Sequence, residues 1–228
     1  MSNPDAGDVN DRLATKYPID DYYERAPLPI RAIERMRLAV VRSFVGDAGG
    51  LDLLEIGSGG GHVLKMFPSA RLTAVDVSDM FLDLARTNLE GFDVRFLKGE
   101  VGDVGLSPQS FDRVICTEVL EHTVDPERIL GEIANLLRPD GIAVITVPND
   151  PLIMRLKHVA GLVLGRRWVE RRASWGGDSF HLHHWKPAEF RELLDRHLHV
   201  VDERRVPARL FPVRLCYRCV LHPPGMPE

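Results

Sequence analysis

Short apolar runs alternate with helical segments along the middle of the chain, from residue 51 to residue 148. Continuous runs of Val, Ile and Leu of this length are typical of strands buried on both faces, as in parallel sheets. Their alternation with helices predicts βαβ units and therefore an α/β fold, a doubly wound sheet with helices on both faces. The predicted strands are Leu51–Ile56, Leu72–Val77, Val94–Leu97, Arg113–Cys116 and Ile142–Val147. The predicted helices between them are Gly61–Phe67, Asp79–Leu89 and Pro126–Leu137, the last with Asp125 as its cap.

The segments on either side of this region extend the same domain. Before it, apolar residues spaced three or four apart predict a helix with one buried face over Ile30–Phe44. The alternation stops after Pro148 and later resumes with one helix and two strands. These are predicted at Pro187–His197, Val200–Arg205 and Val213–Leu221. We therefore predict a mobile N-terminal arm over residues 1–28 and a single domain over residues 29–228.

Length and charge limit the class of protein. A chain of 228 residues is long enough for one α/β domain and short for two. Its formal net charge of −4 argues against nucleic acid as a partner, because proteins that bind it usually carry a basic surplus. No apolar stretch approaches the roughly 20 residues that cross a bilayer, and the first residues lack a secretory pattern. Three cysteines do not make an extracellular disulfide scaffold, so we expect a cytoplasmic protein.

A glycine-rich segment, Glu55–Gly61, follows the first predicted strand directly. Glycines at such a place let the backbone turn sharply and approach a ligand closely. A dinucleotide-binding G-x-G-x-x-G motif would need a third glycine where His62 or Leu64 stands, so neither register fits. A P-loop is excluded because no Lys-Ser/Thr pair follows the glycines. What remains is an acidic residue followed by alternating glycines, namely Glu55, Gly57, Gly59 and Gly61.

An acidic residue, Asp76, stands at the end of the second predicted strand. A carboxylate there, about 20 residues past the glycines, can accept hydrogen bonds from both ribose hydroxyls of an adenosine. It would repel a 2′-phosphate, which disfavours NADP. The alternative is that Asp76 only caps the next helix, although Ser78 and Asp79 could themselves do so. The preceding glycine segment favours the ribose role.

Five blocks between residues 50 and 148 resemble, in order, the motifs of class I S-adenosylmethionine-dependent methyltransferases. These blocks are Leu53–Gly61, Asp76–Ala85, Ser110–Ile115, Glu118–His122 and Leu136–Gly141. The block Glu118–His122 is most similar to ubiquinone-biosynthesis O-methyltransferases and to many natural-product methyltransferases. The resemblance implies a Rossmann-like sheet of seven strands with the last strand antiparallel. It also implies S-adenosyl-L-methionine as the cofactor, bound over the carboxyl edge of the sheet.

The resemblance further implies roles for single residues in binding this cofactor. Glu118 and Val119, just past the fourth predicted strand, would lie close to the transferred methyl group. Glu100 and Val101 match the position at the adenine edge, where relatives often have Asp in place of Glu100. Asp76 would hold the ribose. The adenine would be flanked by Val77 and Met80, and the methionine half surrounded by Glu55, Gly57, Gly59 and Gly61.

Two histidines are candidates for a general base. A hydroxyl nucleophile benefits from a base with a pKa near the working pH, and histidine is the natural choice. His122 closes the block Glu118–His122 in the loop where an acceptor would approach, but it could instead brace that loop by hydrogen bonding. His181 precedes the helix Pro187–His197, and in similar enzymes a histidine here often faces the substrate cavity. Loop histidines without any catalytic role are also common.

His181 and polar residues near it in the sequence could also suggest a metal site, made of His181, His183, His184 and Asp178. A catalytic zinc needs three well-placed protein ligands, which the spacing does not establish, so we predict no metal. Some relatives in quinone pathways do use a divalent cation.

Cys216 and Cys219 lack the second pair of a zinc site, and their odd separation in a strand sends them to opposite faces. We predict reduced structural cysteines.

Residues 149–186 form a predicted insertion whose first part is amphipathic and basic. We predict that it covers the acceptor as a cap, which favours an acceptor with an apolar portion and an anionic group. There are two alternatives: this part docks on an acidic membrane surface, or it is an ordinary surface helix in contact with solvent. The apolar face comprises Leu152, Leu156, Val159 or Ala160, and Val163, and the positive charge comes from Arg155, Lys157, Arg166, Arg167, Arg171 and Arg172.

These features together predict methyl transfer from S-adenosylmethionine to a small molecule, with oxygen as the favoured acceptor atom, by in-line displacement. A methyltransferase acting on protein or RNA is the second interpretation. Against it, the fourth strand leads into Cys116–Val119 and not into the Asn/Asp-Pro-Pro-aromatic motif of adenine N6-methylating enzymes. A cofactor-binding protein without methyl transfer is the third. Either a monomer or a homodimer fits the sequence.

Overall fold

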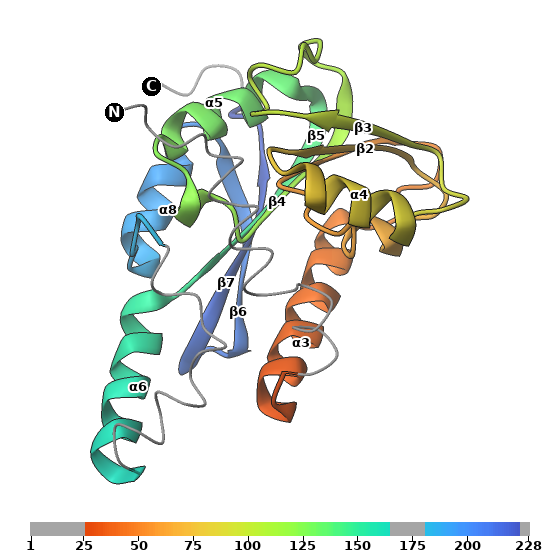
Figure 1. The fold of residues 1–228 in the computed structure, drawn as a ribbon. Helices are drawn as coiled ribbons and strands as arrows, with labels where there is room; N and C mark the ends of the chain where they lie inside the picture. Colours follow the sequence, from red (N-terminus) through yellow and green to blue (C-terminus); the bar gives the residue numbers. More distant parts are fainter. Residues whose placement is uncertain (1–25, 165–180, 224–228) are drawn as a thin grey trace, which may run out of the picture.

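A computed structural model describes residues 26–164 and 181–223. Within these ranges seven strands form one sheet in the order β3-β2-β1-β4-β5-β7-β6 (Figure 1). β1 to β5 are parallel, and β7 runs antiparallel to both of its neighbours, β5 and β6. The predicted doubly wound sheet with an antiparallel last strand is therefore confirmed. The strands are β1 (Asp52–Ile56), β2 (Arg71–Asp76), β3 (Val94–Lys98), β4 (Phe111–Thr117), β5 (Leu137–Pro148), β6 (His199–Ala208) and β7 (Phe211–Val220).

Helices cover both faces of this sheet. One face shares a buried core with α3 and α4, and the other face shares a second core with α5 and α8. α6 begins where β5 ends and extends away from the sheet (Figure 1). The helices are α3 (Leu28–Val45), α4 (Asp79–Asn88), α5 (Pro126–Leu136), α6 (Asp150–Leu164) and α8 (Pro187–Asp195). No helix in the described ranges is both long enough and apolar enough to span a membrane.

Neighbouring residues of the central strands belong to opposite cores. Leu53 and Leu54 are adjacent in β1, and both are fully buried, one in each core. Successive side chains of a strand point to opposite faces, so a strand covered on both sides is apolar at almost every position. Cys216 and Cys219 of β7 likewise lie in different cores, as predicted. Burial raises the pKa of each of these thiols to about 12, which keeps them protonated and unreactive.

The predicted helix Gly61–Phe67 is wrong, because only a short 3-10 helix, η1 (Leu64–Met66), forms there. Gly61 has φ +77°, which is incompatible with a helical residue, so no helix can start before His62. Pro68 then follows Phe67, and a proline disfavours the helical conformation of the residue before it. Phe67 accordingly has φ −126° and ψ 60°. Too few residues remain between these two limits for a stable α-helix.

The carboxyl ends of the parallel strands meet at one edge of the sheet, and the loops that follow them carry most of the candidate residues. β7 runs in the opposite direction, so its amino end reaches this edge. Arg214 of β7 is the register partner of Pro148, the last residue of β5. The edge is therefore built from the ends of five parallel strands and the start of one antiparallel strand.

Candidate active site

The glycine segment after β1 turns tightly against two neighbouring loops. Gly57, Gly59 and Gly61 have φ of +67°, +49° and +77°, a left-handed region that side chains disfavour. The backbone N–H groups of Gly57 and Ser58 donate hydrogen bonds to the carbonyl of Val75 in β2, at 2.8 and 3.0 Å. A Cβ atom on Gly57 would overlap Cγ2 of Val119, in the loop after β4. The bare backbone therefore permits close contact between the ends of β1, β2 and β4.

Asp76 ties the glycine segment to the end of β2. Its side chain is buried, and its two oxygens accept hydrogen bonds from the N–H groups of Gly59 (2.8 Å) and Ser78 (2.9 Å). The hydroxyl of Ser78 accepts a bond from the N–H of Phe81 and thereby caps α4. The alternative that Asp76 itself serves as the helix cap is thus not needed. The carboxylate lies at the edge of the sheet, beside the glycines.

Glu55 is a buried carboxyl group beneath the glycine segment. Its residue is 1% exposed, and its Oε2 atom has no hydrogen-bond partner in the described part of the chain. Burial raises the pKa of Glu55 well above its ordinary value, and the charge of Arg37 opposes this shift only in part. A buried polar atom without a partner is costly, so its presence beside a glycine turn fits a site for a polar ligand group.

The candidate residues after β2 and β3 lie beside Asp76. The N–H of Gly99 donates to the Asp76 carbonyl at 3.0 Å, which brings the segment after β3 to this position. Val101 of that segment is buried in the core, whereas the exposed Glu100 carboxylate forms an ion pair with Arg128 of α5 at 3.1 Å. Val77 is partly buried after β2, and Met80 is 40% exposed in the first turn of α4.

Glu118 lies just past β4 in a strained backbone conformation, with φ +55°. Several contacts hold it there. Its N–H donates to the carbonyl of Thr146 at 2.9 Å, and its Oε1 accepts a bond from the Thr146 hydroxyl at 2.8 Å. Its Oε2 pairs with Arg214 at 3.0 Å, and Arg214 also pairs with Glu34 of α3. β5, β7 and α3 thus fix the loop that begins with Glu118 and Val119.

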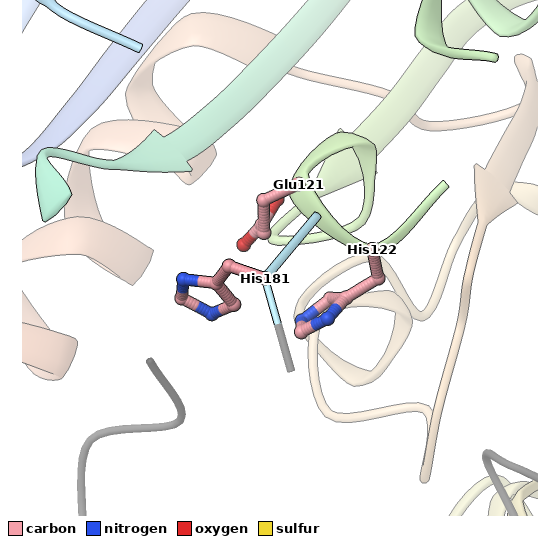
Figure 2. A group of neighbouring side chains, drawn as sticks. All are labelled: Glu121, His122 and His181. Atoms are coloured by element: carbon pink, nitrogen blue, oxygen red, sulfur yellow. The ribbon is translucent and has the colours of Figure 1, made fainter. Parts of the chain in front are cut away.

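The two candidate histidines, His122 and His181, lie next to each other although distant segments supply them. His122 ends the short 3-10 helix η2 (Leu120–His122), and its ring lies 4.9 Å from that of His181, centre to centre, at an interplanar angle of 73°. Figure 2 shows the two rings together with Glu121. The N–H groups of Leu182 and His183 donate to the Glu121 carbonyl at 2.7 and 3.3 Å. These bonds anchor the segment before α8 onto η2.

Two groups of side chains have the residue types and spacing of metal ligands. Glu121, His122 and His181 form one group, and Asp150, His181 and His184 form the other, with the ligand atoms of each group within 4.8 Å of one another. Burial, with a smaller effect of Glu118, raises the pKa of Glu121 well above its ordinary value. Our expectation of no metal stays a prediction.

The metal set considered from the sequence is only partly assembled. His181 and His184 do approach each other, with ring centres 6.2 Å apart. His183 turns away, because its Nε2 contacts the Thr123 carbonyl at 3.0 Å and its ring stacks on Trp185. Asp178 lies outside the described residues, as do the four arginines of the predicted insertion that follow residue 165.

The sequence analysis missed two acidic residues of this site. Asp150 contacts both His181 and His184, and Glu121 lies beside His122. Asp150 comes two residues after the end of the fifth strand, and polar residues after the carboxyl ends of parallel strands are expected to face the ligand edge. This position after the fifth strand was the feature of the sequence that could have identified Asp150. The contact with two histidines some thirty residues later could not be derived from spacing alone.

Comparisons with known proteins agree with this geometry. A family model described as "Methyltransferase domain" matches residues 54–145. The chain is 35% identical over 190 residues to a ubiquinone biosynthesis O-methyltransferase of Caulobacter vibrioides, covering 73% of this chain and 70% of that protein. It is 32% identical over 171 residues to the protein of that name from Xanthomonas euvesicatoria pv. vesicatoria, covering 71% and 67%.

Solved structures of methyltransferases share the fold. The magnesium protoporphyrin IX methyltransferase (ChlM) of Synechocystis PCC 6803, with bound SAH, superposes with a TM-score of 0.67 at 18% identity, covering 94% of this chain and all of that one. The 1,6-didemethyltoxoflavin-N1-methyltransferase of Burkholderia thailandensis, with its substrate and S-adenosylhomocysteine bound, gives a TM-score of 0.62 at 22% identity, covering 98% and 92%. At such identities the likeness concerns the fold alone.

Proposed function

Because the chain belongs to the class I S-adenosylmethionine-dependent methyltransferases, we propose that it methylates an oxygen atom of a small molecule. The relatives that are more than 30% identical are named ubiquinone biosynthesis O-methyltransferases, which supports both the acceptor class and the acceptor atom. S-adenosylmethionine supplies a methyl group that its positively charged sulfur already activates. The protein therefore has to bind and align the two reactants, exclude water and accept a proton.

The donor site in this proposal is the edge formed by β1, β2 and β3. Asp76 holds the ribose, Val77 and Met80 flank the adenine, and the segment with Glu100 and Val101 borders it. The Glu55 oxygen that has no partner among the described residues and the left-handed glycines support a site for the polar methionine half. The residues proposed for that half are Glu55, Gly57, Gly59 and Gly61, with Glu118 and Val119 beside the methyl group.

The adjacent rings of His122 and His181 are the observation that carries the proposal of an oxygen acceptor. A neutral hydroxyl is a weak nucleophile, and a base in hydrogen-bond reach accelerates its reaction. Both rings lie beside the loop that begins with Glu118, where the methyl group is proposed to be. We assign the base to His181, because its side chain is 9% exposed and held by Asp150, whereas His122 is exposed.

Residues 149–186 are proposed to cap the acceptor. α6 supports this, because several of its described apolar side chains are exposed. Leu156, Val159 and Leu162 are 41%, 57% and 74% exposed. An apolar face that the described residues leave exposed is suited to an acceptor with an apolar portion. Docking on an acidic membrane surface would use the same face and stays an alternative.

The proposal is tested by giving the protein S-adenosylmethionine with a ¹³C-labelled methyl group and a panel of small phenols, alcohols, amines and carboxylates. The carbon shift of a transferred methyl group distinguishes O-methyl, N-methyl and C-methyl products. An O-methyl product from at least one hydroxyl compound is expected. Labelled protein or RNA with no labelled small molecule would contradict the proposal. Tight cofactor binding without transfer to any acceptor would contradict it as well.

The tight glycine turn gives a separate prediction about the donor site. Gly57→Ala is expected to lower S-adenosylmethionine affinity at least about tenfold, since the new Cβ would push Val119 away and the left-handed backbone costs about 1–2 kcal/mol. Gly91→Ala is the matched control, because Gly91 has φ +84° and open space around it. It should lose stability but keep its affinity in calorimetric titrations. Equal loss of affinity in both variants would show that the turn itself is unimportant for binding.

A further inference from the structure

Asp150 is a buried acid at the beginning of α6, two residues after the end of β5. It is 1% exposed, and in the described part of the chain its side-chain hydrogen bonds go only to histidines. The Nδ1 atoms of His181 and His184 lie 2.7 and 3.0 Å from the same oxygen, Oδ2. The other oxygen, Oδ1, is buried and has no hydrogen-bond partner among the described residues. The proposed donor site does not use this acid.

The contacts of Asp150 favour the ionised form of its carboxyl group, because an ionised oxygen can accept a hydrogen bond from both rings, whereas a single proton on it could be donated to only one. Burial alone would raise the pKa of Asp150, but the hydrogen bonds with His181 and His184 oppose this effect, and the pKa lies below the ordinary value. A carboxylate can only accept hydrogen bonds. Each of the two histidines must therefore carry its proton on Nδ1 in order to make the observed contact.

This contact determines the chemistry of the opposite ring nitrogen. A neutral imidazole carries one proton, so a proton on Nδ1 leaves a lone pair on Nε2. The His181 side chain is 9% exposed, and its ring packs edge-on against His122 (Figure 2). The hydrogen bonds of Leu182 and His183 to the Glu121 carbonyl keep the segment in this place. The His181 ring is therefore held in one position, with its proton on Nδ1.

We propose that Asp150 is a positioning residue for methyl transfer, which holds His181 as the Nδ1–H tautomer so that Nε2 can accept the acceptor's proton. The O–H bond of the acceptor breaks, an N–H bond forms on Nε2, and the electron pair stays on the oxygen that takes the methyl group. The imidazolium so formed lies beside the Asp150 carboxylate, which stabilises its charge. This inference rests on the proposed function, in which His181 is the base.

Nuclear magnetic resonance of the full chain with ¹⁵N-labelled histidine tests the proposal without an acceptor. Two-bond nitrogen–proton spectra distinguish the two tautomers, and His181→Gln assigns the His181 signals. The wild-type protein is expected to show His181 with the proton on Nδ1. In Asp150→Ala the ratio of the tautomers should shift at least about tenfold toward Nε2–H, because the hydrogen bond to the charged group is lost. A wild-type protein with the proton on Nε2, or an unchanged ratio in the variant, would overturn the proposal.

Two further variants keep the test decisive. His184→Ala removes the other histidine on the same oxygen, and it should leave the His181 tautomer unchanged. Asp150→Asn has nearly the same shape and serves if the alanine variant fails to fold. Its amide N–H can donate to Nδ1, which also favours the Nε2–H tautomer. An unchanged affinity for S-adenosylhomocysteine, measured by calorimetry, shows that each variant is folded.

The tautomer experiment and the acceptor experiment fail in different ways. If no O-methyl product forms, the proposed function is wrong, whatever the spectra show. If an O-methyl product does form, Asp150→Asn should lower kcat about a hundredfold and leave the KM for S-adenosylmethionine unchanged. An unchanged kcat with that acceptor would overturn the role of Asp150 while leaving the proposed function intact.

Discussion

Replacing Asp76 with alanine is expected to weaken S-adenosylmethionine binding about a hundredfold. A hydrogen bond to a charged group contributes about 1.5–3 kcal/mol, and the proposed carboxylate would accept bonds from the ribose hydroxyls. The substitution also removes the bond from the Gly59 N–H that orients the glycine segment. Isothermal titration with S-adenosylmethionine measures the loss directly.

Asp79→Ala is the matched control for this experiment. Asp79 lies three residues farther along the chain and is exposed at the start of α4, where it pairs with Lys98. The variant changes the net charge by the same amount, and an exposed pair contributes at most about 1 kcal/mol to stability. Its cofactor affinity should stay within about twofold of the wild type. If both variants bind S-adenosylmethionine as the wild type does, Asp76 has no ribose role.

His181→Ala is expected to lower kcat by about two to four orders of magnitude once an acceptor is known, because general-base catalysis typically supplies that factor. The affinity for S-adenosylmethionine should be unchanged, since His181 lies outside the proposed donor site. Steady-state kinetics and calorimetry separate the two effects. His122→Ala tests the neighbouring ring. If His122 only braces its loop, this variant should lose stability or acceptor affinity more than kcat.

His183→Ala is the control from the same segment. His183 points to the Thr123 carbonyl and stacks on Trp185, so it is placed for packing. Its loss should lower the melting temperature more than kcat. If kcat fell strongly in His183→Ala and stayed nearly normal in His181→Ala, the assignment of the base to His181 would be wrong. A fall of cofactor affinity in His181→Ala would indicate damage to the fold.

The strands of this fold could be predicted because burial on both faces imposes a simple pattern. Leu53 and Leu54 pack into different cores, so two apolar side chains stand next to each other in β1, which is typical of a central strand. The helix error at Gly61–Phe67 has the opposite origin. Val63, Leu64 and Phe67 are buried there, but Gly61 and Pro68 restrict the backbone, and these backbone limits prevent the helix that the side-chain spacing predicts.

The site could be predicted only where its residues follow local patterns. The glycines, Asp76 and the block ending in His122 each stand directly after a strand, and the structure places them together at one edge. Arg214 and Asp150 act through contacts with residues far away in the chain. Such contacts depend on how α3, β7 and the segment before α8 pack, and no spacing in the sequence encodes that. Their roles stay predictions, as do those of the residues assigned to the donor.

The position of β7 has a consequence for how this scaffold can diversify. Because β7 is antiparallel, its amino end and α6 meet at the same edge as the strands that are proposed to hold the donor. The residues proposed to bind the donor all precede residue 120, whereas Asp150 and His181 come from the later half of the chain, and Arg214 connects the two parts through its ion pair with Glu118. Substitutions around Asp150 and His181 can therefore change the acceptor while the proposed donor site is kept, as long as Arg214 is retained to hold Glu118.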